Sequence, residues 1–192
     1  MKIISGKFKG RNLIGPKNYN IRPTSNRAKE MIFNTLNSFL IKTENDWRNI
    51  SVLDCFCGTG ALGIEAISRG AKNVIFVDKS KEALKICNDN CSDLKVNNSV
   101  EIICLDINKE SFNDTISKID LFFIDPPYGK FSIDLLLDKL RLSLNKKALG
   151  VIELPRQDQE KNFKNFTQLK VKYISNSKFV FIKKKIDLFS SE

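Results

Sequence analysis

The sequence predicts an α/β protein whose mostly parallel sheet carries helices on both faces, preceded by a small N-terminal extension. Short apolar runs typical of buried strands alternate with helical apolar periodicities between residues 50 and 154. Strands that alternate with helices favour right-handed β-α-β units, which build a parallel sheet. The length of 192 residues, of which 42% are hydrophobic and 28% charged, is enough to bury a sizeable core and excludes disorder of the whole chain.

The N-terminal extension is predicted to contain a hairpin and a helix. Residues 3–11 combine strand formers with glycines and predict a short hairpin. An apolar stripe over residues 28–40 predicts a helix whose first turn can be capped by one of three polar residues, Thr24, Ser25 or Asn26. We therefore expect an extension over residues 1–45 and a main domain over residues 46–192.

The main domain is predicted to alternate strands and helices. Strands are expected at residues 52–56, 74–77, 100–105, 121–124 and 148–154. Helices are expected over residues 61–67, from Ser80 to about Leu94, and from Ser132 to about Leu144. Two further runs, at residues 169–174 and 178–184, predict a hairpin that closes the sheet.

The charge of the chain is concentrated at its two ends. The sequence contains 32 Lys+Arg and 22 Asp+Glu, which gives a net charge of +10. Residues 1–29 and 161–185 each hold eight basic residues and no acid, whereas residues 30–160 are mildly acidic. This asymmetry favours an anionic partner, most often a nucleic acid, although charge alone is equally compatible with a solvated basic surface.

The residue content excludes several classes of function. The sequence contains no histidine, which removes the usual general base, Ser-His and Cys-His nucleophiles, and the usual zinc ligand. We expect the five cysteines to be ordinary thiols, several of them in the core, and we expect no metal. There is no apolar run long enough for a membrane span, and the first residues are charged too early for a signal peptide. We therefore expect a cytoplasmic protein with no membrane partner.

Loops at the carboxyl ends of the predicted strands carry carboxylates and glycines. Doubly wound sheets bind their ligands at this edge. The first of these loops holds Asp54 and the glycines of Gly58-Thr59-Gly60, which allow a ligand to approach the backbone closely. Asp78 follows the next strand, where a carboxylate can accept both ribose hydroxyls of a nucleoside. Asp106 follows the third strand, in a position to meet an adenine edge.

The same glycines also match the dinucleotide fingerprint Gly-x-Gly-x-x-Gly, which suggests a nicotinamide oxidoreductase as an alternative. Two features disfavour it. Asp54 ends the strand before the glycines and would repel a pyrophosphate, whereas it would attract a cation such as the ammonium of an amino acid. The chain also has no room for a separate domain to bind a hydride acceptor.

The most specific motif is Asp125-Pro126-Pro127-Tyr128, directly after the fourth predicted strand. The two prolines hold the backbone rigid and remove two N–H donors, so acceptors dominate the motif. A side-chain carboxylate and neighbouring carbonyls can hold the two N–H groups of an exocyclic amine and direct its lone pair at an electrophile. Tyr128 offers an aromatic face on which a base can stack.

These motifs resemble those of S-adenosylmethionine-dependent amino-methyltransferases. One family, the RsmD-type 16S rRNA (guanine(966)-N(2))-methyltransferases, is matched more closely, through Ile3-Ile4-Ser5-Gly6 with Gly10-Arg11, Arg22-Pro23-Thr24 and Arg27-x-x-Glu30-x-x-Phe33. The resemblance runs co-linearly from residue 1 to about residue 155. It implies a Rossmann-like, seven-stranded methyltransferase fold, S-adenosyl-L-methionine as methyl donor, and a guanine of 16S rRNA as acceptor, in free rRNA, in the 30S subunit or in an assembly intermediate.

The resemblance also implies roles for individual residues. The cofactor would be bound by Asp54, Phe56, Gly58, Thr59, Gly60, Asp78, Lys79, Asp106 and Ile107, with Arg22 and Thr24 closing over the site. The guanine amine would be held by Asp125, Pro126, Pro127 and Tyr128; many relatives have Phe in place of the tyrosine, and either ring can stack. We expect RNA contacts from Lys7, Lys9, Arg11, Arg22 and Arg27. The run Lys183-Lys184-Lys185 matches no signature of the family.

The predicted reaction is in-line transfer of the sulfonium methyl group to the guanine N2, by a monomer. Such a transfer depends on proximity, orientation and electrostatic stabilisation. Two alternatives remain open. An Asp-Pro-Pro-Tyr motif can serve any planar amine, so DNA adenine or protein glutamine could be the acceptor. A non-catalytic RNA-binding assembly factor is a second alternative, which is weakened because the acidic and glycine positions are all filled.

Overall fold

A computed structural model describes residues 1–15, 25–107, 109–110, 112, 116, 118–127, 132–158 and 162–186. The chain divides into two compact units, residues 1–106 and residues 107–192. The expected boundary at residue 45 stays a prediction. Within the described ranges, no helix has both the length and the apolar character that a membrane crossing requires.

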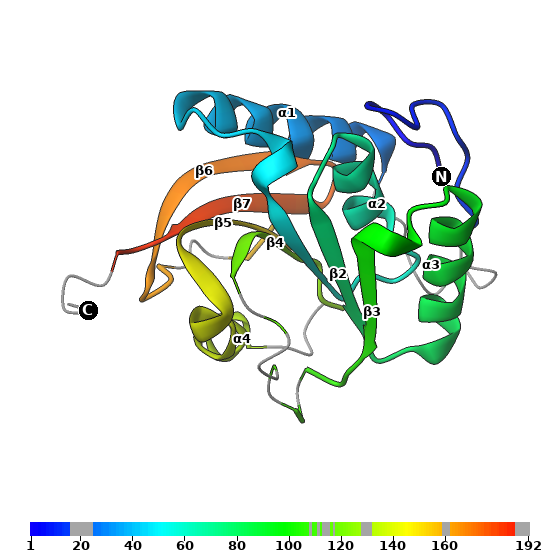
Figure 1. Cartoon of the computed structure of the whole chain (residues 1–192). Coiled ribbons are helices and arrows are strands. Elements are labelled where there is room, and N and C mark those ends of the chain that lie inside the picture. Colours follow the sequence, from blue (N-terminus) through cyan, green and yellow to red (C-terminus); the bar gives the residue numbers. More distant parts are fainter. Residues whose placement is uncertain are drawn as a thin grey trace. The chain divides into compact units, whose positions relative to one another are not determined.

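Unit 1 contains three parallel strands in the order β3-β2-β1 (Figure 1). They are β1 (Ser51–Cys55), β2 (Asn73–Asp78) and β3 (Val100–Cys104). The strands end level with one another, because Cys55 pairs with Val77 and Asp78 pairs with Cys104. The loops that follow the three strands therefore leave the same edge of the sheet, as the sequence predicted.

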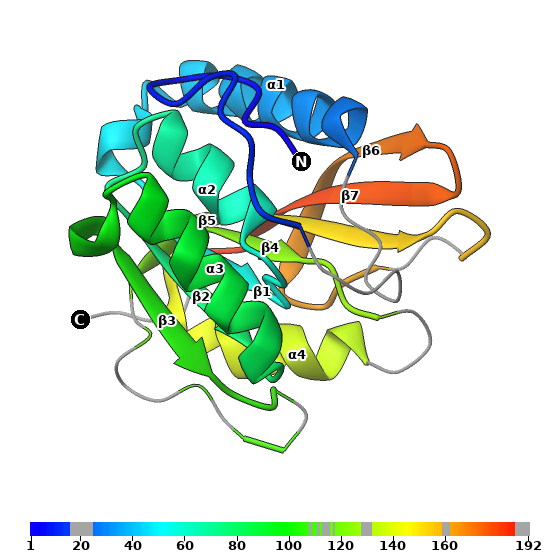
Figure 2. The same ribbon diagram turned by 90° about the vertical axis from the view of Figure 1, so that its right-hand side faces the viewer.

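Two helices of unit 1 pack on this sheet. Helix α2 (Ala61–Ser68) contacts β1 and β2, and helix α3 (Lys81–Asp93) contacts β2 and β3 (Figures 1 and 2). The 3₁₀ turn η2 (Asn97–Ser99) leads from α3 towards β3. Ser80 caps α3 by accepting a hydrogen bond from the Ala83 N–H at 3.2 Å, which confirms the predicted start of this helix.

The N-terminal helix is α1 (Asn26–Lys42), followed by the 3₁₀ turn η1 (Trp47–Asn49). Of the three candidate caps, Ser25 accepts the hydrogen bond from the Ala28 N–H, at 3.1 Å. The Trp47 ring lies 5.6 Å from the Phe33 ring, and its indole N–H donates to the side-chain oxygen of Asn37 at 2.7 Å. The start of the helix agrees with the sequence prediction.

Residues 1–15, called the N-terminal segment below, form less β structure than predicted. A single bridge joins Lys2 and Asn12 in place of a regular hairpin ladder. The reason is that backbone donors of this segment bond to α2. The N–H groups of Ile4 and Ser5 donate to the Glu65 carboxylate at 2.8 and 3.0 Å, and the Phe8 N–H donates to the Ser68 hydroxyl at 3.0 Å.

Glu65 is the centre of a buried charged cluster. Its carboxylate also accepts a 2.9 Å ion pair from Arg69, whose guanidinium lies 4.7 Å from the centre of the Phe33 ring. Lys29 on α1 is fully buried and donates to the backbone carbonyl of Lys2 at 2.5 Å. Burial lowers the pKa of the Lys29 ammonium, and the nearby Glu65 carboxylate opposes that shift. The cluster thus joins the N-terminal segment, α1 and α2.

Unit 2 contains four strands in the order β4-β5-β7-β6. They are β4 (Ile119–Ile124), β5 (Leu144–Pro155), β6 (Phe166–Ile174) and β7 (Ser177–Lys184). Strand β5 runs parallel to β4, whereas β7 is antiparallel to both β5 and β6. The long β6–β7 ribbon, drawn in orange and red in Figure 1, is the predicted closing hairpin. Helix α4 (Ile133–Leu140) starts at the predicted cap Ser132 and continues into the 3₁₀ turn η3 (Arg141–Ser143).

The helix before β5 is shorter, and β5 longer, than the sequence predicted. Helix α4 ends at Leu140 rather than near residue 144, and β5 already begins at Leu144. A distant side chain stabilises this change of direction, because the Lys184 ammonium donates to the carbonyls of Arg141 and Leu144, both at 2.9 Å. The pattern of apolar residues around residues 140–144 does not indicate this contact with Lys184 of β7.

We expect the substitution Glu65→Gln to lower the free energy of unfolding by about 3 kcal/mol or more, because it leaves buried cationic groups without their counter-charge. Urea denaturation followed by circular dichroism measures this loss. The matched control is Arg48→Gln, which breaks the exposed Arg48–Asp46 pair at 2.8 Å and should change stability little. Equal stability of the Glu65→Gln variant and the wild type would show that the buried cluster does not support the fold.

Candidate functional site

The loop between β1 and α2 has an unusual backbone. Phe56 has a φ of 60°, which is uncommon for a residue other than glycine, and Gly58 and Gly60 have φ values of 54° and 85°. The Cys57 N–H donates to the carbonyl of Val77 at 3.0 Å, which ties the loop to β2. Left-handed backbone at such a position is frequently found at functional sites. Residues 56–60 are called the glycine loop below.

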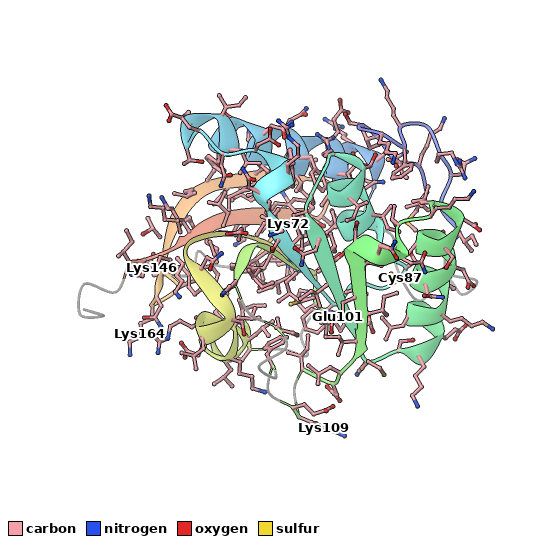
Figure 3. The ribbon with its side chains drawn as sticks, viewed as in Figure 1. Lys72, Cys87, Glu101, Lys109, Lys146 and Lys164 are labelled. Atoms are coloured by element: carbon pink, nitrogen blue, oxygen red, sulfur yellow. The ribbon has the colours of Figure 1, made fainter. Side chains whose placement is uncertain are left out.

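The three glycines between β1 and the first turn of α2 have different surroundings. A Cβ atom at Gly63 would lie 2.3 Å from the Phe76 ring, so the missing side chain lets α2 pack closely on β2. A Cβ atom at Gly60 would lie 2.7 Å from the sulfur of Cys87, a residue that Figure 3 labels on α3. A Cβ atom at Gly58 would meet no atom of the described residues within 4 Å. As far as the described residues go, Gly58 therefore borders open space, where a ligand could approach the backbone.

Asp54 lies beneath the glycine loop and is only 2% exposed. Its carboxylate accepts a 2.8 Å hydrogen bond from the Gly63 N–H in the first turn of α2. Burial raises the pKa of Asp54 to about 7; the Gly63 hydrogen bond opposes this shift, and the nearby Asp78 carboxylate adds to it. Asp54 therefore joins the end of β1 to the first turn of α2, across the glycine loop in sequence.

Asp78 is fixed at the end of β2 by two backbone donors. One carboxylate oxygen accepts from the Gly58 N–H and the other from the Ser80 N–H, both at 2.9 Å. Each carboxylate oxygen has two lone pairs, so each retains acceptor capacity beyond its backbone bond. The half-buried carboxylate thus has a defined orientation and can accept two further hydrogen bonds, such as those from a pair of hydroxyls.

The other predicted cofactor residues follow β1, β2 and β3 in the sequence. Thr59 is buried and Lys79 exposed, while Asp106 is half-buried just after β3. The Leu105 N–H donates to the Asp78 carbonyl at 3.0 Å, so the loops after β2 and β3 are joined. Ile107, the first residue of unit 2, is 4% exposed. Unit 1 thus brings together Asp54, the glycine loop, Asp78 and Asp106 at one sheet edge.

The Asp-Pro-Pro motif follows β4 of unit 2. Asp125 is half-buried, Pro126 buried and Pro127 exposed, after a strand whose last four residues are buried. The two prolines have no N–H groups, so the backbone of this motif offers only carbonyl acceptors at these two positions. Three predicted site residues, Tyr128, Arg22 and Thr24, lie outside the described residues.

Four of the five predicted RNA contacts in the N-terminal region are exposed in the described part of the chain. Lys7, Lys9 and Arg11 are exposed on the N-terminal segment, and Arg27 is exposed in the first turn of α1. The Arg11 guanidinium reaches the backbone carbonyl of Asp93 at the end of α3, at 3.5 Å. These positive groups lie in the same unit as the glycine loop.

The basic residues near the C-terminus are different, because several support the fold of unit 2. Lys178 is 2% exposed and donates to the carbonyl of Asp158, and Lys185 donates to the carbonyl of Lys164 at 3.1 Å. Together with the Lys184 contacts described above, these bonds give part of the Lys183–Lys185 run a structural role. Other lysines of the unit, including Lys146 and Lys164 in Figure 3, are exposed.

Sequence reasoning missed two polar residues that hold the loops in place. Asn90 on α3 is 2% exposed and donates to the Thr59 carbonyl of the glycine loop at 3.1 Å. Lys139 on α4 donates to the Ile107 carbonyl at 2.8 Å and to the Glu110 carbonyl at 3.2 Å, within unit 2. A signal for Asn90 was present, since it shares the apolar face of α3 with Cys87 and Cys91 at helical spacing.

The cysteines form no disulfide, and four of the five are buried. This agrees with their predicted role as core thiols. The neighbouring thiol and then burial raise the pKa of the Cys87 and Cys91 thiols. The pKa of the Cys57 thiol, which Cys87 lowers, is raised on balance, by burial and by the nearby carboxylates and Cys55. Among the described residues, no cluster of three or more His, Cys, Asp or Glu side chains has the geometry to hold a metal ion.

Solved structures share the architecture of this chain. The yhhF protein of Escherichia coli has a TM-score of 0.81 at 22% sequence identity, with 97% of this chain and 99% of that chain covered. An RNA methyltransferase from Salinibacter ruber, in complex with S-adenosyl-L-homocysteine, has a TM-score of 0.63 at 14% identity, with 88% and 98% covered. The chain therefore has the predicted Rossmann-like methyltransferase fold with a seven-stranded, mostly parallel sheet.

Sequence relatives define the family. A family model described as Conserved hypothetical protein 95 matches residues 1–183. Ribosomal RNA small subunit methyltransferase D of Buchnera aphidicola is 34% identical over 159 residues, which cover 83% of this chain and 78% of the relative. The protein of the same name from Haemophilus influenzae is 33% identical over 180 residues, covering 90% and 88%. The chain belongs to this RsmD-type family, as its motifs indicated.

The raised pKa of Asp54 predicts a specific dependence of stability on pH. An unfolded aspartate titrates near pH 4, so between about pH 4 and the folded pKa of about 7 the folded chain holds the extra proton. The free energy of unfolding should therefore fall as pH rises through this window, by as much as about 4 kcal/mol from this one group, and level off above it.

The substitution Asp54→Asn should remove this contribution while leaving an oxygen to accept the Gly63 N–H. The measurement is urea unfolding of wild type and variant at several pH values from 4 to 8, and the difference between the two curves isolates Asp54. Asp89→Asn, which removes an exposed carboxylate from α3, controls for the loss of one negative charge. A difference curve that does not change with pH would contradict the raised pKa.

Proposed function

We propose that this chain transfers the methyl group of S-adenosyl-L-methionine to the exocyclic N2 of a guanine in 16S rRNA. The observation that carries the proposal is the pair of carboxylates around the glycine loop, Asp78 held by two backbone donors and Asp54 buried below. The names of the relatives, Ribosomal RNA small subunit methyltransferase D, support small-subunit rRNA as the acceptor. We propose that the protein acts as a cytoplasmic monomer.

The described residues fit the nucleoside part of this cofactor. Asp78 retains one acceptor position on each oxygen, which suits the two ribose hydroxyls. The open space beside Gly58 lets a ligand lie against the loop backbone. Asp106 and Ile107 would meet the adenine, with Lys79 at the rim. This fit depends on side-chain acceptors that are already oriented by the fold, so little order must be gained on binding.

The charge of the site also fits. S-adenosylmethionine is cationic at its sulfonium and ammonium groups, and Asp54 is a buried acid whose pKa is raised to about 7. A cation at the glycine loop would lower that pKa and favour the carboxylate. Asp54 would act from beneath the loop, through its bond to the first turn of α2, while Phe56, Gly58, Thr59 and Gly60 would line the methionine part.

The acceptor amine would be held by the Asp-Pro-Pro-Tyr motif. When bound, S-adenosylmethionine supplies a methyl group on a sulfonium, which a nitrogen lone pair can attack. Asp125 and the carbonyls beside the prolines would accept the N–H bonds of the amine and direct its lone pair, and Tyr128 would stack on the base. As the new N–C bond forms, the bond from the methyl carbon to the sulfonium sulfur would break, so that the thioether leaves, and the nitrogen would release its proton towards the Asp125 carboxylate that holds it. Arg22 and Thr24 would close over the site.

The decisive experiment is methylation of 16S rRNA and of 30S particles that lack the modification, with the product mapped by mass spectrometry. A methyl group on the N2 of a guanine supports the proposal. A methyl group on adenine, or none on guanine, contradicts the proposed acceptor. Activity on free rRNA compared with activity on particles shows which of them is the substrate.

We predict that Asp125→Ala lowers the rate of methyl transfer by at least about 100-fold, because the amine loses its orienting acceptor. Calorimetry should find cofactor binding largely unchanged, since the proposed cofactor residues are intact. The matched control is Asp134→Ala, which removes an exposed carboxylate from the first turn of α4. Normal turnover by the Asp125→Ala variant would exclude its role in catalysis.

We predict that replacing Lys7, Lys9 and Arg11 by Gln weakens RNA binding and reduces the slope of log affinity against log salt by about 2 to 3. For each cation removed from the protein, RNA binding releases about one counterion fewer from the RNA. The affinity for the cofactor should stay the same. The control removes the same charge elsewhere in unit 1, from the exposed lysines Lys42, Lys72 and Lys85. An unaltered salt slope for the first variant would mean that this end of the chain is a solvated surface.

A further inference from the structure

The side chain of Asn90 bonds to two separate parts of unit 1. Its oxygen accepts from the Ile14 N–H at 2.7 Å, and its amide nitrogen donates to the Ile14 carbonyl at 3.1 Å. The same nitrogen donates its other hydrogen to the Thr59 carbonyl at 3.1 Å. Asn90 is only 2% exposed, and its bond to Thr59 is buried.

The two parts joined by Asn90 have different proposed functions. Ile14 lies in the N-terminal segment, three residues after Arg11, the last of its three proposed RNA contacts. Thr59 lies between the two glycines that would line the cofactor. Asn90 therefore bonds directly to the backbone of the N-terminal segment and to the backbone of the glycine loop, and no other residue is needed to connect them.

Other anchors of the N-terminal segment do not reach the glycine loop. Ile4 and Ser5 bond to Glu65, and Phe8 bonds to Ser68, all in the second half of α2. The Ile14 side chain is 46% exposed, so apolar burial does not explain why the chain is held at this point. The N–H and the carbonyl of Ile14 are instead both hydrogen-bonded to the side-chain amide of Asn90, as they would be to the backbone of a neighbouring strand.

We propose that Asn90 is a positioning residue that couples binding of the methyl donor to binding of RNA. The inference rests on the proposed function. A cofactor that fixes the Thr59 carbonyl also fixes Asn90 and, through it, the backbone of Ile14, so less order remains to be gained when RNA binds to the N-terminal segment. By linkage, RNA must strengthen cofactor binding by the same factor.

The test compares the affinity of unmodified 16S rRNA, transcribed in vitro, with and without saturating S-adenosylhomocysteine. The wild-type protein should bind RNA about fivefold or more tightly in the presence of the nucleoside. Asn90→Asp keeps the shape and the acceptor for Ile14 but loses both donors, so the ratio of the two affinities should fall close to one. Asn37→Asp makes the same change on α1 and leaves an oxygen for the Trp47 indole, so it should keep the wild-type ratio.

A second pair of variants perturbs the other end of the bond and leaves Asn90 in place. Ile14→Pro removes the backbone N–H that donates to the side-chain oxygen of Asn90. Ile14→Ala shortens the exposed side chain and keeps this N–H. The ratio should fall for Ile14→Pro and stay at the wild-type value for Ile14→Ala. This pair decides the question if Asn90→Asp does not fold.

The outcomes separate this inference from the function on which it rests. Absence of S-adenosylhomocysteine binding, or of methyl transfer, would overturn the proposed function. A wild-type protein that methylates RNA but shows a ratio of one would overturn the coupling alone. The coupling through Asn90 is also refuted if a folded Asn90→Asp keeps the wild-type ratio or, where that variant does not fold, if Ile14→Pro keeps it.

Discussion

The buried carboxylate of Glu65 is the interaction on which unit 1 depends most. It lies on α2, the helix that begins at the glycine loop, and it accepts bonds from the N-terminal segment and from Arg69. Burying a charge is costly unless it is paired and hydrogen-bonded, so the packing of α2 depends on these partners. The irregular N-terminal segment is consequently part of the core that positions the candidate site.

The opposite end of α2 is held just as firmly, by contacts of another kind. Asp54 accepts the Gly63 N–H, and the absence of a side chain at Gly63 brings the helix against the Phe76 ring. Asp78 then bonds to the Gly58 N–H and fixes the loop from its other side. The glycine loop thus has its left-handed conformation imposed by its surroundings, which is what a site with pre-oriented acceptors requires.

The features that could be predicted from the sequence are those with local causes. The serine caps of α1, α3 and α4 and the short buried strands of unit 1 follow from neighbouring residues. The missed features depend on distant partners: Glu65 meets Ile4 across 61 positions, and Asn90 meets Ile14 across 76. The early start of β5 also depends on a distant partner, because the Lys184 ammonium bonds to the carbonyls of Arg141 and Leu144. For the candidate site, the sequence pointed to the carboxylates of unit 1, but no local pattern revealed the Asn90 contact.

The anchoring of the N-terminal segment has a consequence for its dynamics. The backbone amides of Ile4, Ser5 and Phe8 belong to no helix or strand, yet each donates to a side chain of α2. Amides in irregular segments usually exchange their hydrogens with solvent through small local fluctuations. Here exchange requires the segment to separate from the buried side chains of Glu65 and Ser68, so these protons should be protected like those of a central strand. Their exchange rates would report the opening of the core beneath the glycine loop.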